Sequence, residues 1–152
     1  MTLASTLADR TARNHGRDPW KVAARLGIRV KRMDLPAPHR ELYAQRHGAG
    51  GSAGLAIAKS ASDLEARELL AHGIAHHLMH VGDRVSGESS AIWSGRHERE
   101  ADDFAALLLI PPYGLSRLTA GSAQGQVAEL SEEWCVSEPL ARRRLRLARS
   151  LD

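Results

Sequence analysis

The chain has 152 residues, 43% of them hydrophobic and 26% charged, which is typical of a soluble globular protein and predicts a single domain over residues 1–152. The net charge of +3 is mild but unevenly distributed, with a cluster of arginines near the C-terminus, and the single Cys135 excludes an intramolecular disulfide. The start of the chain does not resemble a signal peptide, and the longest apolar run, residues 105–112, is too short to span a bilayer. We therefore expect a cytoplasmic protein that makes no membrane contact.

The first third of the chain predicts two helices and a small sheet. Residues 2–14 have an amphipathic helical pattern, and Asp18-Pro19 is typical of the start of a second helix, which ends at Gly27. Residues 28–33 alternate apolar and basic side chains, as a half-buried strand does. Residues 41–46 and 55–59 are two further strand candidates, joined by a glycine-rich turn at 48–52. We expect a three-stranded, largely antiparallel sheet.

The rest of the chain is predicted to be helical. Ser62 and Glu65 form a capping-box signature before a helix that runs to about residue 81. A polar loop at 82–95 precedes a second long helix, which begins near residue 96 and is stopped by Pro111-Pro112. Helices at 126–134 and 138–150 follow. The fold class is therefore α+β and mainly helical, with a core at 17–112 and a C-terminal helical layer at 113–152.

Two histidines four residues apart indicate a metal site. His72 and His76 lie on one face of the predicted helix, so both imidazoles can reach one ion, as in the H-E-x-x-H helices of zinc peptidases. Catalytic Zn²⁺ needs three protein ligands, and the next long helix offers Glu98 and, one turn later, Asp102. We expect Glu98 to be the third ligand and Asp102 to accept a hydrogen bond from a ligand histidine. Without Glu98, the two histidines would be read as polar residues capping the core.

Other side chains near these motifs are weaker candidates. Glu100 and His97 point away from Glu98 on the helical wheel, by about 200° and 100° respectively. His77 and His80 are expected on or near the surface. Glu100 and His97 are therefore weaker alternatives to Glu98, and His77 and His80 are not predicted to bind the metal.

Both motifs resemble the ImmA/IrrE family of zinc metallopeptidases. Residues 66–80 match its R-F-T-L-A-H-E-x-x-H-x-x-x-H helix, and residues 98–111 match its E-x-x-A-(N/D)-x-F-A-x-x-L-L-x-P segment. Residues 18–30 match its D-P-x-x-x-A-x-x-L-G-I-x-V opening, so the likeness spans about 18–150. It implies a zincin-like, gluzincin-type core with Zn²⁺ on His72, His76 and Glu98. It also implies a regulatory role with a protein partner, such as a transcriptional repressor that active members cleave.

The sequence departs from this pattern at Gly73, where the motif has its general base. That glutamate takes a proton from the zinc-bound water, and its loss typically lowers the rate by about 10²- to 10⁴-fold. Glycine also costs about 1 kcal/mol in a helix interior, so a close neighbour at this position is one explanation. Glu68 and Glu88 are the nearby carboxylates, and the sequence places neither at the missing position. No catalytic residue is assigned, and a pseudoenzyme is favoured over an active peptidase with an unconventional base.

The C-terminal segment allows a third hypothesis, DNA binding. Residues 127–149 resemble a helix-turn-helix, with Cys135 where the turn often has glycine. Arg142, Arg143 and Arg144 are candidates for phosphate contacts. The simpler interpretation, which we favour, is a helical layer of the fold with its arginines on the solvent face.

Overall fold

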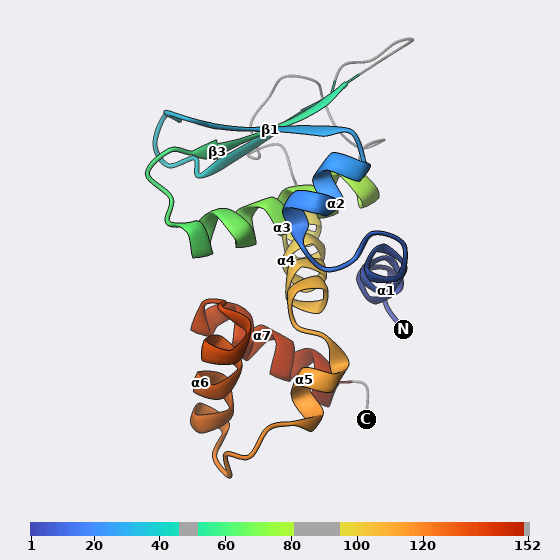
Figure 1. Cartoon of the computed structure of the whole chain (residues 1–152), viewed down its shortest axis with the longest axis vertical. Coiled ribbons are helices and arrows are strands. Elements are labelled where there is room, and N and C mark those ends of the chain that lie inside the picture. Colours follow the sequence, from blue (N-terminus) through green and yellow to red (C-terminus); the bar gives the residue numbers. More distant parts are fainter. Residues whose placement is uncertain (46–51, 81–94, 151–152) are drawn as a thin grey trace.

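The structure is a computed structural model that describes residues 1–45, 52–80 and 95–150. Figure 1 shows the sheet at one end of the molecule, two long helices below it, and the C-terminal helices at the other end. None of the helices in these ranges combines the length and apolar character that a bilayer crossing requires.

Two short helices begin the chain where caps predict them. Helix α1 (Leu3–His15) starts at Thr2, which forms a capping box with Ser5. Helix α2 (Pro19–Arg25) starts at Asp18, whose carboxylate accepts from the Trp20 amide. Gly27 follows with φ of 72°, a left-handed conformation that costs glycine little, and the chain turns into the sheet.

The sheet is mixed, where a largely antiparallel one was expected. Strands β1 (Ile28–Met33), β2 (Glu41–Gln45) and β3 (Ala53–Ala58) are arranged in the order β1-β3-β2. β1 runs parallel to β3, and β2 runs antiparallel to it. Composition explains the order, because β3 is nearly all apolar and takes the central place, whereas β1 is largely solvent-exposed and lies at an edge.

Two long helices carry the core. Helix α3 (Asp63–Met79) begins at Ser62, which caps the Glu65 amide, and α4 (Gly95–Leu109) packs against it. Ala101 and Ala105 of α4 are buried and small, which permits this close approach. The mainly helical α+β fold is therefore confirmed.

Three helices form the C-terminal layer: α5 (Pro112–Ser116), α6 (Ala123–Trp134) and α7 (Glu138–Arg149). Sequence reasoning did not separate α5. Cys135 joins α6 to α7 with φ of 49°, the left-handed conformation for which a glycine is usual. Arg67 of α3 donates to the carbonyls of Trp134 and Cys135, so the layer is tied to the histidine helix.

Candidate metal centre

Helix α3 places the two histidines side by side. The Nε2 atoms of His72 and His76 are 3.0 Å apart, and their ring centroids are separated by 4.7 Å. His76 is 1% exposed, whereas His72 borders a pocket. This arrangement follows directly from the four-residue spacing on one helix.

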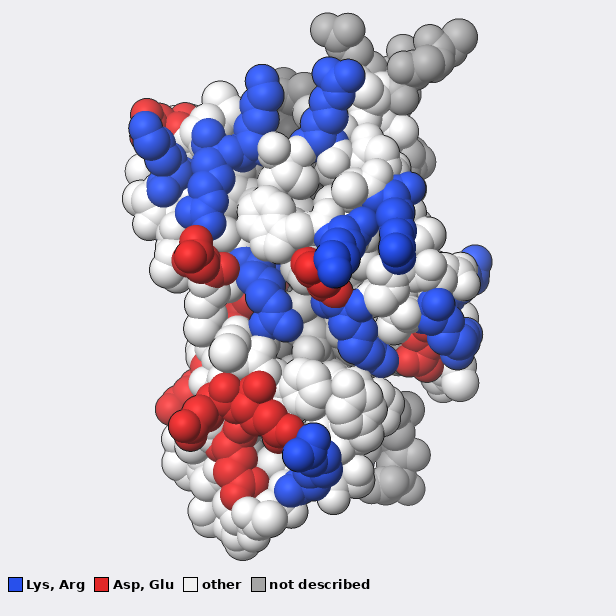
Figure 2. Space-filling model, viewed as in Figure 1, with Lys and Arg blue, Asp and Glu red and all other residues white. Residues whose placement is uncertain are grey.

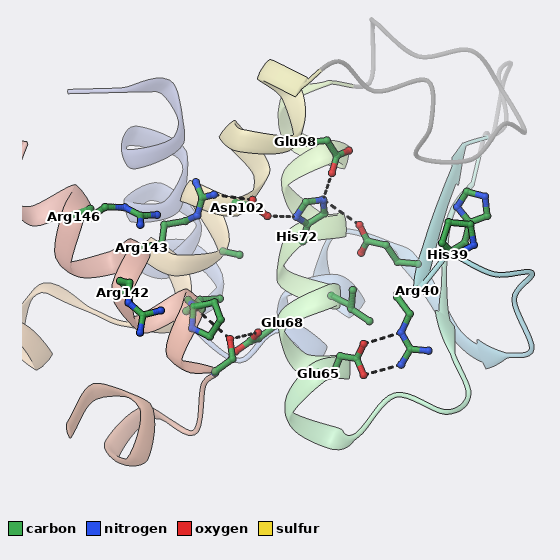
Figure 3. A pocket seen from close by; sticks show the side chains of 17 residues that line it. His39, Arg40, Glu65, Glu68, His72, Glu98, Asp102, Arg142, Arg143 and Arg146 are labelled. Carbon is green, nitrogen blue, oxygen red and sulfur yellow. Dashed lines mark hydrogen bonds and ion pairs between the residues drawn. The ribbon is translucent and has the colours of Figure 1, made fainter. Parts of the chain in front are cut away.

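Helix α4 brings Glu98 to both imidazoles, as the sequence predicted. One carboxylate oxygen lies 3.2 Å from His72 Nε2, and the other lies 3.3 Å from His76 Nε2. Asp102, one turn later, lies 3.0 Å from the opposite ring nitrogen of His72, Nδ1. Figure 3 shows His72 between these two carboxylates.

Asp102 is itself held by the C-terminal helix. Its second oxygen accepts from Arg143 at 3.0 Å, and Arg143 also donates to Asp103 at 2.7 Å. A carboxylate on Nδ1 requires that this nitrogen carry the proton, which leaves Nε2 of neutral His72 with a lone pair. Asp102 therefore fixes the tautomer and orientation of His72, through the contact that the sequence predicted.

A histidine relay does the same for His76. His76 Nδ1 lies 2.9 Å from His80 Nδ1, and His80 Nε2 lies 3.1 Å from Glu100. Hydrogen bonds from Arg96 and His80 lower the pKa of Glu100, so its carboxylate accepts and His80 carries its proton on Nε2. His80 Nδ1 then accepts from His76 Nδ1, and His76 Nε2 keeps its lone pair.

The expectation that His80 lies near the surface is therefore wrong. His80 is 2% exposed, because it continues the face of α3 that His72 and His76 begin and packs against the ring of His97. His77 is half-buried on another face, where its Nδ1 lies 2.7 Å from the Tyr43 hydroxyl.

Strand β2 adds a carboxylate that sequence reasoning missed. Glu41 Oε1 lies 3.2 Å from His72 Nε2, and single ligand atoms of Glu41, His72 and His76 all lie within 4.8 Å of one another. Glu41 is 8% exposed, and its other oxygen is buried without a hydrogen-bond partner in the described structure. In the sequence, the only indication of this role was a charged residue at a strand position whose side chain faces the core.

The charges of the centre are strongly coupled. Burial disfavours the His72 imidazolium, but Glu41, Asp102 and Glu98 outweigh it and raise the pKa of His72 to about 10. Burial also opposes ionisation of Glu98, yet its contacts with His72 and His76 lower the pKa of Glu98 to about 2. Burial raises the pKa of Glu41 to about 7. The carboxylates around His72 therefore favour a positive charge at this place.

The donor geometry fits zinc. Tetrahedral coordination with bonds of 2.0–2.1 Å places neighbouring ligand atoms about 3.3 Å apart. The separations among His72, His76 and Glu98 are 3.0, 3.2 and 3.3 Å. Imidazole nitrogen and carboxylate oxygen are also donors that zinc accepts.

Residues 23–146, most of the chain, match the family Peptidase_M78, described as IrrE N-terminal-like domain. The chain belongs to this family. Its domain is metallopeptidase-like and typically metal-dependent, in agreement with the cluster of Glu41, His72 and His76. No match was found among curated proteins.

Gly73 in this IrrE-like domain is packed against the sheet. A Cβ atom at this position would lie 2.5 and 2.7 Å from the two methyl carbons of Leu55 in β3. The close neighbour that the glycine suggested is therefore a side chain. Glu68 does not replace the missing base, because its two oxygens accept from the amide and hydroxyl of Ser137. Glu88 lies outside the described residues.

A pocket of about 730 Å³ opens beside the centre of this IrrE-like domain. His72, Glu98 and Asp102 line its floor, residues 38–41 line one side, and Arg142, Arg143 and Arg146 of α7 line the other. Figure 3 shows these three arginines on the α7 side of His72.

The expectation that Arg144 faces solvent is wrong. It is 4% exposed and donates through Nε to the Ile110 carbonyl at 2.9 Å, so it cannot reach a phosphate. Arg143 is committed to Asp102 and Asp103, and Arg142 is exposed, 3.5 Å from Glu138. Figure 2 shows acidic side chains gathered at the end of the molecule where α6 lies, the helix that carries Glu129, Glu132 and Glu133.

Proposed function

We propose that this protein is a zinc-binding domain of peptidase ancestry that is impaired or inactive in hydrolysis and acts through a protein partner in the cytoplasm. One observation carries the proposal: the donors of His72, His76 and Glu98 converge, while the backbone position next to His72 faces Leu55 and bears no side chain.

The support for metal binding is the preset state of the donors. Asp102 and the His80–Glu100 pair hold the Nδ1 protons, so the Nε2 lone pairs of the two neutral imidazoles point to one place. Glu98 bridges them from a neighbouring helix. A bound Zn²⁺ would supply Lewis-acid polarisation of a carbonyl or of water at this place.

The support for impaired hydrolysis is that Gly73 bears no side chain at the position where the motif has its base. A water-activating group must lie within about 2.6–3.2 Å of the proton that it removes, and Gly73 offers none. The competing interpretation, an active endopeptidase that cleaves a repressor-type protein, requires a different carboxylate at the centre. Glu41, whose Oε1 lies 3.2 Å from His72 Nε2, is the candidate for that role.

The support for a polypeptide partner is the shape of the pocket wall. Strand β2 pairs with β3 on one side, and the residues leading into it, 38–41, line the pocket. An extended segment can add to a sheet edge by main-chain hydrogen bonds while its side chains enter a neighbouring pocket. Together with the family likeness, this favours a protein regulator such as a transcriptional repressor as the partner.

Two measurements test the proposal. Elemental analysis of the purified chain should give about one zinc per molecule, lost in His72→Ala and Glu98→Ala and retained in the control His77→Gln, whose side chain faces Tyr43. Peptide hydrolysis should be absent from the wild type. A wild type that binds no zinc would refute the proposal, and a wild type that cleaves peptides in a zinc-dependent manner would favour the active-peptidase alternative.

A further inference from the structure

We propose that Glu41 is a fourth ligand of the metal, so that the centre is a closed His₂Glu₂ site instead of an open catalytic one. This inference rests on the proposed function, because it assumes that His72, His76 and Glu98 hold an ion. It adds a residue from the sheet to ligands that come from α3 and α4, and it assigns the centre a structural or partner-binding role.

Three candidate donors surround the Nε2 atom of His72 at the separations that ligands of one ion have. His72 Nε2 lies 3.2 Å from Glu41, 3.2 Å from Glu98 and 3.0 Å from His76, which are three edges that meet at one corner. The His76–Glu98 edge is 3.3 Å, and the His76–Glu41 edge is at most 4.8 Å. The separations of 3.0–3.3 Å fit zinc, because ligand atoms about 3.3 Å apart correspond to tetrahedral bonds of about 2.0 Å.

The charges of these contacts support the same inference. Glu41 and Glu98 are two carboxylates on one largely buried imidazole, and each raises the energy of the other. A divalent cation balances both, so the closed site is neutral. It also provides a partner for the buried Glu41 oxygen that has no hydrogen bond in the described structure.

The strand holds Glu41 in place. Glu41 and Tyr43 are two residues apart and project from the same face of β2, where both are buried. Glu41 contacts His72 while Tyr43 contacts His77, one and a half turns later on α3. The strand therefore contacts the helix at two places, His72 and His77. The fold therefore holds the buried side chain of Glu41 at the centre, and Glu41 is not a surface carboxylate that lies near it by chance.

The occupant of the fourth coordination position distinguishes a catalytic zinc site from a structural one. Catalytic zinc sites leave this position to water, whereas structural sites fill it with a protein ligand. With Glu41 in this position, the ion has neither a base at Gly73 nor a water to activate.

Cobalt-substituted full-length protein provides the test, because tetrahedral Co²⁺ absorbs visibly and responds to a new ligand. Acetohydroxamate is the probe, since it chelates a metal only where a coordination position is open. The wild-type spectrum should not change with acetohydroxamate. In Glu41→Gln the spectrum should change, and the affinity for zinc, measured against a chelator, should fall by at least about a hundredfold, because loss of a supporting residue alone costs about 10- to 100-fold.

Glu65→Gln is the matched control, because Glu65 also lines the pocket but pairs with Arg40. It should behave as the wild type does. The wild-type spectrum decides the question even if Glu41→Gln fails to fold. Acetohydroxamate binding by the wild type would overturn the inference, as would an unchanged zinc affinity in Glu41→Gln. Hydrolysis by the wild type that Glu41→Gln abolishes at equal zinc content would identify Glu41 as a base instead. A wild type without metal would refute the proposed function as well.

Discussion

The Cβ position of Gly73 lies 2.5 Å from a methyl carbon of Leu55, so helix α3 and strand β3 touch where the histidine motif normally has a glutamate. Leu55 is 2% exposed and belongs to the core, so it has little room to move. The glycine and the leucine therefore fit each other as a pair, and a larger residue at either position must disturb the other.

Stability measurements can test this pairing. Gly73→Ala gains about 1 kcal/mol of helix propensity but should lose about 1–3 kcal/mol to overpacking. Leu55→Ala should cost about 2–5 kcal/mol because it leaves a cavity. In the double variant the new methyl enters that cavity, so we expect a favourable coupling of about 1–3 kcal/mol in urea unfolding. Additive effects would show that the two sites do not share the space.

The same contact determines how hydrolysis could be restored. Gly73→Glu alone should not produce a peptidase, because its side chain meets Leu55. We expect activity only when Leu55→Ala and Glu41→Gly accompany it, which makes room for the base and opens the fourth coordination position. The measurement is zinc-dependent cleavage of an unstructured protein, and Gly73→Gln in the same background is the control. Cleavage by Gly73→Glu alone would contradict both the steric argument and the closed centre.

Removal of metal should lower the thermal stability. A ligand present at 100 times its dissociation constant stabilises the folded state by about 2.7 kcal/mol, which corresponds to roughly 5–10 °C in Tm for a chain of this length. We expect that decrease when EDTA is added to the wild type and no decrease in His72→Ala. A Tm that does not respond to EDTA while zinc leaves the protein would mean that the ion contributes nothing to the fold.

The histidine relay should influence metal affinity although it does not touch the ion. His80→Phe keeps the ring but removes the acceptor of the His76 Nδ1 proton, so the zinc affinity should fall about 10- to 100-fold. His77→Phe is the matched control on the same helix, and chelator competition is the measurement. Equal affinities in the two variants would show that the relay does not set the tautomer of His76.

The pKa of about 10 for His72 makes metal-free stability depend on pH. Because this folded-state pKa lies above the ordinary value of 6.5, the contribution is complete below pH 6.5 and is lost as pH rises toward 10. In EDTA, the free energy of unfolding should therefore fall over that interval by on the order of a few kcal/mol. His72→Gln should flatten the curve.

Zinc should reverse this trend, because it binds the deprotonated imidazole and displaces the proton. Calorimetry of zinc binding in buffers with different ionisation enthalpies should show the release of about one proton at pH 8. A heat of binding that is the same in every buffer would contradict the protonation state assigned to His72.

Sequence reasoning predicted the ligands that arise from local spacing. His72 and His76 are four apart, as are Glu98 and Asp102, and a helix turns such spacings into shared faces. The helix starts at Asp18 and Ser62 were also predicted, because each side chain caps its helix locally. The Thr2 cap acts in the same way but was not predicted.

What depends on strand order could not be predicted. Glu41 reaches the centre from the edge strand β2, and Leu55 faces Gly73 from the central strand β3. His80 was missed because a histidine at the end of a helix gives no local indication that a neighbouring helix covers it. The position of the C-terminal arginines likewise depends on how α7 docks on α4, which no spacing encodes.

Arg143 is joined to His72 through Asp102, so the environment of a candidate ligand extends to the last helix of the chain. A fragment trimmed to the two histidine and glutamate motifs would contain three donors but would lack both the strand carboxylate and the guanidinium that fixes Asp102. Fusion proteins or truncations intended to isolate the centre must therefore retain at least residues 41–143.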